Sequence, residues 1–139
     1  MQKVVESLLK KHKTNCPFEI AKDRGINIKF ADLGESTRGI YYSKFRKRFI
    51  VIHNKLPDDW QRLVCAHELG HDILHRGINR FFIDSHTFFI AAKHERQANI
   101  FAVHLLTANE SAQEDETISA FFSRNNIPLE MIMYFKGVL

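Results

Sequence analysis

The spacing of apolar residues changes at residue 58, and this change restricts the chain to folds that contain both strands and helices. Between residues 26 and 53, apolar and polar residues alternate, as in strands with one buried face. From Asp58 onward, apolar residues recur every three or four positions, as in amphipathic helices. The sequence therefore predicts the α+β class.

The alternating region divides into three runs, 26–34, 38–43 and 47–53, which predict a small, mostly antiparallel three-stranded sheet. Two short helices precede it, the second beginning at Pro17 and ending at Gly25. Long helices are expected at about 57–75 and 88–106, joined by a loop over 76–86. Two short helices over 117–125 and 128–135 close the chain. At 139 residues, we expect a single domain spanning 1–139.

Charge and cysteine content bear on partners and location. The formal charge of +4 comes mainly from basic runs at 10–13 and 44–48, which we interpret as a solvated basic face. No basic helix and no alternation of arginine with exposed aromatics is evident, so direct nucleic-acid binding is not expected. Two isolated cysteines, Cys16 and Cys65, suit a reducing compartment. With no signal-peptide pattern and no long apolar segment, we expect a cytoplasmic protein without membrane contact.

The segment AHELGHDILH at 66–75 carries the residues with the clearest chemistry. His67 and His71 are four residues apart, so on a helix both imidazoles can bind one metal ion. Glu68 is rotated by about 100° from His67 and can reach the open coordination position, where a carboxylate would take a proton from water. The order HExxH within an amphipathic helix therefore predicts a metal centre.

A catalytic zinc site normally has a third protein ligand. His75 lies about 12 Å along the helix from His67, which is too far to share the ion, so we expect it at the helix end or behind the ligands. Glu95 on the second long helix is the favoured third ligand, and His94 is the alternative. Asn99, one turn after Glu95, either forms a hydrogen bond with a ligand or lies on the helix surface.

Four segments together resemble the ImmA/IrrE family of zinc-dependent metallopeptidases: PFEIAKDRGINI, RGIYYS, AHELGHDILH and ERQANIFAVHLL. The resemblance implies one zinc ion per chain, bound by His67, His71 and Glu95, with Glu68 as the catalytic base. It further implies an anti-repressor of phage or mobile-element type, a peptidase that cleaves a helix-turn-helix repressor. The segment LLTANE at 105–110 departs from the LLMP common in the family, which affects contacts beyond the ligand helix.

The mechanism expected from these residues is hydrolysis of a peptide bond. Zinc would polarise the carbonyl and the bound water, and Glu68 would carry the proton from that water to the leaving nitrogen. The run KRFIVIH at 47–53 is a candidate edge strand for the substrate. The sequence does not rank four candidates for the oxyanion partner: Tyr41, Tyr42, Arg96 and His104.

Two other classes of function stay open at this point. A pseudo-peptidase could inhibit a repressor by contact without cutting it, since family resemblance does not establish turnover. A basic nucleic-acid binder is the third hypothesis, and it predicts a steep dependence of DNA affinity on salt. Two imidazoles and a carboxylate also bind iron, cobalt or manganese, so zinc is a preference of ligand type and of resemblance.

Overall fold

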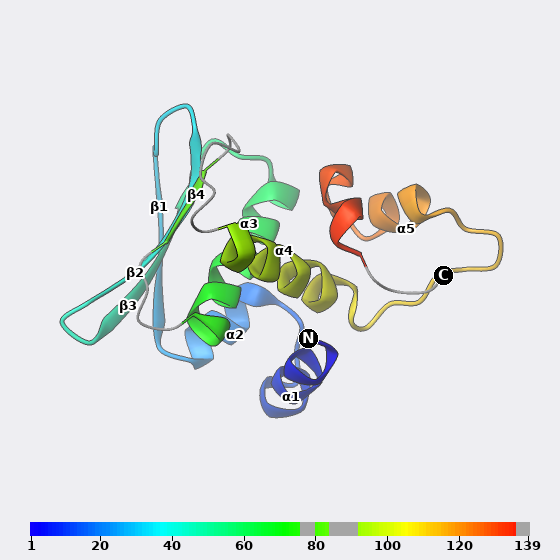
Figure 1. Cartoon of the computed structure of the whole chain (residues 1–139), viewed down its shortest axis with the longest axis horizontal. Helices are drawn as coiled ribbons and strands as arrows, with labels where there is room; N and C mark the ends of the chain where they lie inside the picture. The colour runs from blue at the N-terminus through cyan, green and yellow to red at the C-terminus, as the bar shows by residue number, and fades with distance from the viewer. Residues whose placement is uncertain (76–79, 84–91, 136–139) are drawn as a thin grey trace.

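The computed structural model describes residues 1–75, 80–83 and 92–135, with the backbone alone at 80–83. A four-stranded sheet forms one side of the molecule, and helices pack against one of its faces (Figure 1). The elements in chain order are α1 (Gln2–His12), α2 (Pro17–Asp23), β1 (Ile26–Ala31), β2 (Thr37–Lys44), β3 (Lys47–His53), α3 (Asp58–Leu74), β4 (Arg80–Ile83), α4 (Ala92–Thr107), α5 (Ile118–Arg124) and a 3-10 helix, η1 (Leu129–Tyr134).

The strands lie in the order β1-β3-β2-β4. β3 is parallel to β1 and antiparallel to β2, and β2 is antiparallel to β4, so the sheet is mostly antiparallel as predicted. The three predicted strands are present, and the short β4 lies within the segment expected to be a loop. Its four residues, RFFI, are too few to show a periodic pattern, and pairing with β2 defines the strand.

The prediction that 47–53 is an edge strand is wrong. β3 lies inside the sheet, with β1 on one side and β2 on the other, so its backbone groups are already paired. In the sequence, β2 lies between β1 and β3, yet in the sheet β1 pairs directly with β3. This tertiary arrangement leaves no mark on the spacing of residues in β3.

The core lies between the sheet and α3, and it continues between α3 and α4. Ile50, Ile52 and Tyr41 point from the sheet to α3 and are fully buried. On the other side of α3, Phe101 and Leu105 of α4 are also fully buried. The middle of α3 is therefore covered from both sides (Figure 1), which explains why residues 63–72 are all buried.

The predicted helices are present with modest differences. α3 begins at Asp58 with two aspartates in its first turn, where the helix dipole favours negative charge. The segment predicted as the last helix is a 3-10 helix, following Pro128. The predicted start of the second long helix near residue 88 lies outside the described residues. In the described part of the chain, no helix is both long and apolar enough to cross a bilayer.

Candidate metal centre

The HExxH residues lie in the buried middle of α3. His67, Glu68 and His71 have no exposed surface. Three polar side chains in such a place are costly unless each finds a partner. The sequence produces this burial because apolar residues cover both the sheet side and the α4 side of the helix.

Helix α4 approaches α3 closely because Gly70 has no side chain. A Cβ atom at Gly70 would lie 2.9 Å from Cδ1 of Phe101 and 3.4 Å from the Cα of Ala98. Ala98 and Ala102 are fully buried, as expected for the small residues of a close-packed face. This approach brings Glu95, at the start of α4, to the two histidines.

Three ligand atoms converge between the two helices. Nε2 of His67 lies 2.9 Å from Oε2 of Glu95, and Nε2 of His71 lies 3.0 Å from Oε1 of Glu95. The two Nε2 atoms are 3.2 Å apart. Ligands at zinc distances of 2.0–2.1 Å in tetrahedral geometry would be about 3.3 Å apart. The spacing therefore fits one shared ion after only a slight adjustment.

Hydrogen bonds behind the histidines fix which ring nitrogen faces the cluster. The amide oxygen Oδ1 of Asn99 can only accept, so Nδ1–H of His67 donates to it at 2.7 Å. In the neutral ring of His67, Nε2 then presents a lone pair toward Glu95 and His71. A lone pair facing a carboxylate and a second imidazole requires a cation, and a metal ion fits this place. Asn99 is buried, so the alternative of a helix-surface residue is wrong.

A second chain of hydrogen bonds orients His71. Oε1 of Gln97 accepts a hydrogen bond from Nε2–H of His75 at 2.7 Å. Nδ1 of His75 then accepts from Nδ1–H of His71 at 3.0 Å, which leaves Nε2 of His71 as a lone pair. His94 stacks on His75, with ring centroids 4.0 Å apart, and is not among the converging atoms. His75 thus lies behind the ligands as expected, and Gln97 is a contributor that no sequence signal marked.

Charge and burial set the protonation of the cluster. Burial by itself would raise the pKa of Glu95, but the contacts of its carboxylate with His67 and His71 outweigh burial and lower that pKa. Burial lowers the pKa of His71 to about 4, against the opposing effect of Glu95. At neutral pH the cluster therefore offers a carboxylate and a neutral imidazole at His71, the forms that bind divalent metals.

Glu68 lies beside this cluster with no hydrogen-bond partner for either carboxylate oxygen in the described part of the chain. Burial raises its pKa well above the usual value, and the charge of Glu95 adds to the shift. β2 runs close to this side chain: a Cβ atom at Gly39 would lie 3.2 Å from Oε1 of Glu68. A glycine inside a predicted strand is the signal that could have marked this close approach.

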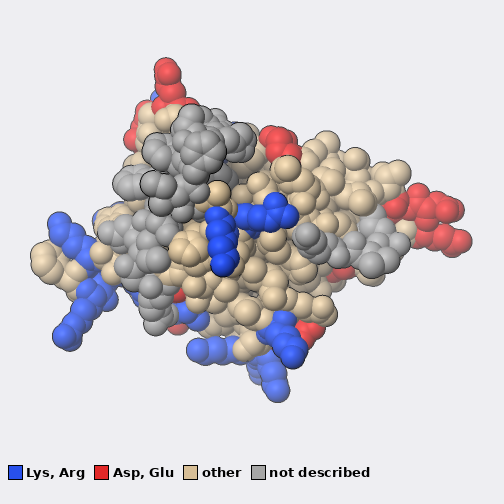
Figure 2. Space-filling model, viewed as in Figure 1, with Lys and Arg blue, Asp and Glu red and all other residues tan. Residues whose placement is uncertain are grey.

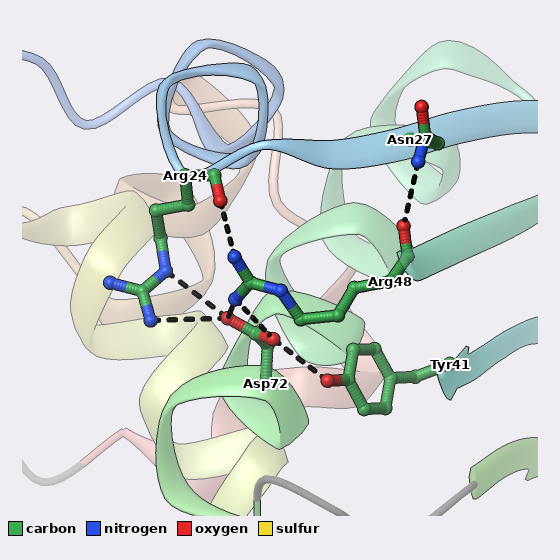
Figure 3. Close-up of polar contacts among 5 residues, drawn as sticks. All are labelled: Arg24, Asn27, Tyr41, Arg48 and Asp72. Atoms are coloured by element: carbon green, nitrogen blue, oxygen red, sulfur yellow. Dashed lines mark hydrogen bonds and ion pairs between the residues drawn. The ribbon is translucent and has the colours of Figure 1, made fainter. Parts of the chain in front are cut away.

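Asp72, the residue after His71, joins α3 to β2, to β3 and to Arg24 at the end of α2 (Figure 3). Its buried carboxylate accepts hydrogen bonds from the hydroxyl of Tyr41 at 2.7 Å, Nη1 of Arg48 at 2.8 Å and Nε of Arg24 at 3.1 Å. Arg48 also donates to the backbone oxygen of Arg24. Sequence reasoning missed this network, because the residues bonded to Asp72 lie 24 to 48 positions before it in the chain.

The network also bears on the oxyanion candidates. The hydroxyl of Tyr41 donates to Asp72, and Tyr42 stacks on Phe49 on the opposite face of β2, since successive side chains alternate. His104 is nine residues beyond Glu95, about 13 Å along the helix. Arg96 follows Glu95 directly in α4, and its side chain is exposed.

Comparison with known proteins assigns the chain to a family. Residues 21–117 match the model of the Peptidase_M78 family, described as the IrrE N-terminal-like domain. An uncharacterized immunity region protein 2 of Bacillus phage phi105 is 34% identical over 91% of this chain and 83% of its own length. Metallopeptidase ImmA of Bacillus subtilis (strain 168) is 32% identical over 88% of this chain and 72% of its own length. No solved structure matches significantly. The matched region contains all the converging residues, and the chain is a member of the ImmA/IrrE family of metallopeptidases.

Proposed function

We propose that this protein is a zinc-dependent endopeptidase of the cytoplasm that cleaves a helix-turn-helix repressor of a phage or mobile element. The observation that carries the catalytic part is the convergence of His67, His71 and Glu95 beside the buried Glu68, whose carboxylate has no hydrogen-bond partner among the described residues. Family membership supports a peptidase, and relatives named as an immunity region protein and as ImmA support a phage-related substrate.

His67, His71 and Glu95 would hold the metal, and zinc suits two imidazoles and one carboxylate with a coordination position left open. When bound, the ion would lower the pKa of a coordinated water toward neutrality and polarise the substrate carbonyl. Asn99 and His75 would keep the histidine lone pairs directed at the ion, because each hydrogen-bonds the opposite ring nitrogen.

Glu68 would serve as the general base and then as the general acid. Its carboxylate takes one proton from the attacking water, and the water oxygen bonds to the carbonyl carbon. As the carbon–nitrogen bond breaks, the same carboxyl group delivers that proton to the leaving nitrogen. Its raised pKa favours this task, because a carboxylate with a higher pKa is a stronger base toward the attacking water.

The test starts with metal content and ends with cleavage. Wild type, E95A and E68Q are purified without a histidine tag, and zinc is measured by inductively coupled plasma mass spectrometry. Each protein is then incubated with the helix-turn-helix repressor of its own immunity region, with and without chelator. We expect about one zinc per chain in wild type and E68Q and loss of zinc in E95A. Cleavage by wild type should be at least about 100-fold faster than by E68Q, with none by E95A.

Two outcomes would contradict the proposal. Full cleavage by E68Q would remove Glu68 from the mechanism. A zinc-loaded wild-type protein that binds the repressor and leaves it full length would instead favour inhibition by contact.

A further inference from the structure

The turn between β2 and β3 extends beyond the rest of the sheet as a two-stranded ribbon. β1 pairs with β3 only from Arg48 onward, and β4 pairs with β2 only as far as Tyr41. Among the described residues, Lys44 and Lys47 therefore have no strand beside them other than each other's. Figure 1 shows this hairpin projecting away from the helices. We refer to residues 44–47 as the hairpin tip.

Three features of the hairpin tip do not contribute to the stability of the fold. Phe45 and Arg46 have φ angles of 52° and 65°, in the left-handed region where two-residue turns normally use asparagine and glycine. Lys44 and Lys47 are direct cross-strand partners, so like charges lie opposite each other. Phe45 is 86% exposed, more than any other large apolar residue of the described chain. Local strain of this kind is often a sign of function.

The hairpin tip is also strongly basic. Lys44, Arg46 and Lys47 are exposed, and none of them forms an ion pair within the described part of the chain. Figure 2 shows basic side chains around the same projecting end of the molecule. Nζ of Lys44 lies 5.4 Å from the centre of the Phe45 ring, so cation and ring are presented together. The tip thus combines one apolar ring with three cations that form no ion pair with another described residue.

The base of the ribbon is stiffened on the outer face of the sheet. Tyr42 and Phe49 are cross-strand partners with stacked rings 4.8 Å apart, and Nζ of Lys29 lies 4.7 Å from the centre of the Phe49 ring. A stiff ribbon holds its tip at a fixed distance from the sheet. Gly39 lies against Glu68 at the metal centre, and Lys44 is five residues farther along β2. The tip therefore lies about 17 Å along the strand from Gly39.

We propose that the hairpin tip binds duplex DNA by entering the major groove. That groove is about 12 Å wide and admits a two-stranded ribbon, while its edges carry the regularly spaced phosphates that Lys44, Arg46 and Lys47 would contact. Phe45 would make apolar contact with base edges such as thymine methyl groups. Phe45 alone offers little apolar area to a lipid bilayer, which disfavours binding to a membrane surface. Cations on both strands of a narrow ribbon instead suit the phosphates on the two sides of a DNA groove.

This inference departs from the expectation that the protein does not bind nucleic acid directly. The run KFRKR at 44–48 does not by itself reveal that Phe45 is exposed at a projecting turn between cations. Nor does it reveal that Arg48 points inward to Asp72. The inference does not depend on the proposed peptidase activity. The tip contributes no metal ligand, and DNA binding can be measured in the presence of a chelator.

The experiment measures anisotropy of a fluorescein-labelled 20-base-pair duplex of mixed sequence between about 50 and 200 mM NaCl. The variant K44Q/R46Q/K47Q is compared with K3Q/K10Q/K11Q, which removes the same charge from the exposed face of α1. We expect the tip variant to raise Kd at least about 10-fold and the α1 variant to change it less than about 2-fold. The wild-type slope of log affinity against log salt should be about −3, from three phosphate contacts, and nearly flat in the tip variant.

A second variant separates binding from folding. Phe45→Asn with Arg46→Gly installs the residues that this turn prefers, so we expect a higher Tm together with weaker DNA binding. Any of three results overturns the proposal: no binding by wild type at about 50 mM NaCl, equal losses in the tip and α1 variants, or tip-dependent binding to vesicles containing phosphatidylserine but not to the duplex.

Discussion

At Asn99, one amide oxygen decides how His67 presents itself to the metal cluster. Because Oδ1 of Asn99 accepts from Nδ1–H of His67, the Nε2 lone pair faces Glu95. We expect N99A to raise the dissociation constant for zinc about 10- to 100-fold, measured by competition with a chromophoric chelator. N99D keeps an acceptor oxygen and should restore most of the affinity. An N99A protein with wild-type affinity would show that the hydrogen bond does not orient the ligand.

Gly39 positions Glu68 because it has no side chain to displace it. A methyl group there would overlap Cγ1 of Val64 and press on Glu68. We expect G39A to lower the free energy of unfolding by about 1–3 kcal/mol, measured by urea denaturation, and to slow cleavage because Glu68 is displaced. G39A with Val64→Ala removes the main overlap and should recover part of the activity. Equal activity in G39A and wild type would mean that β2 can move aside freely.

At the scale of elements, the Asp72 network attaches α3 to β2, to β3 and to Arg24, the residue that follows α2. Replacing a buried charge and leaving two arginines beside it is strongly destabilising, so we expect D72N to cost about 3–5 kcal/mol in urea denaturation. D58N makes the same charge change at the exposed start of α3 and should cost less than about 1 kcal/mol. A similar small cost in D72N would show that the network adds little to stability.

The same network predicts a dependence on pH. Burial by itself would raise the pKa of Asp72, but Tyr41, Arg48 and Arg24 outweigh it and lower that pKa. A lowered folded-state pKa means that this stabilisation is complete above the ordinary value of 3.8 and is lost as pH falls through the lower folded value. Urea denaturation of wild type in chelator should show this acid loss. D72N should lack that component of the curve, and an unchanged curve would contradict the assignment.

At the scale of the whole molecule, a bound ion would link α3 to α4 across the core. Ligands that bind only the folded state raise its stability, by about 2.7 kcal/mol at a free zinc concentration 100 times Kd. For a chain of this size we expect Tm to rise by about 10 °C, measured by circular dichroism with zinc against excess chelator. E95A should show little rise, since it lacks one of the three converging groups. An equal rise in E95A would place the ion elsewhere.

The sequence determined those features that depend on the spacing of neighbouring residues. Alternation and helical periodicity predicted the α+β class and most elements, and the four-residue spacing of His67 and His71 put both rings on one side of α3. The motif and the family resemblance also directed attention to Glu95, which the structure brings to within hydrogen-bonding distance of both histidines. These predictions succeeded because their cause is local backbone geometry.

Only the tertiary structure decided the features that join distant parts of the chain. β3 lies inside the sheet because β1 pairs with its outer side. Gly39 contacts Glu68 because β2 packs against α3, and Asp72 forms hydrogen bonds with residues up to 48 positions away. The pairing of β2 with β3 likewise turns an ordinary basic run into a projecting, strained tip. Such contacts depend on how whole elements pack, and packing is decided by the sum of many side chains, so no short pattern of residues encodes it.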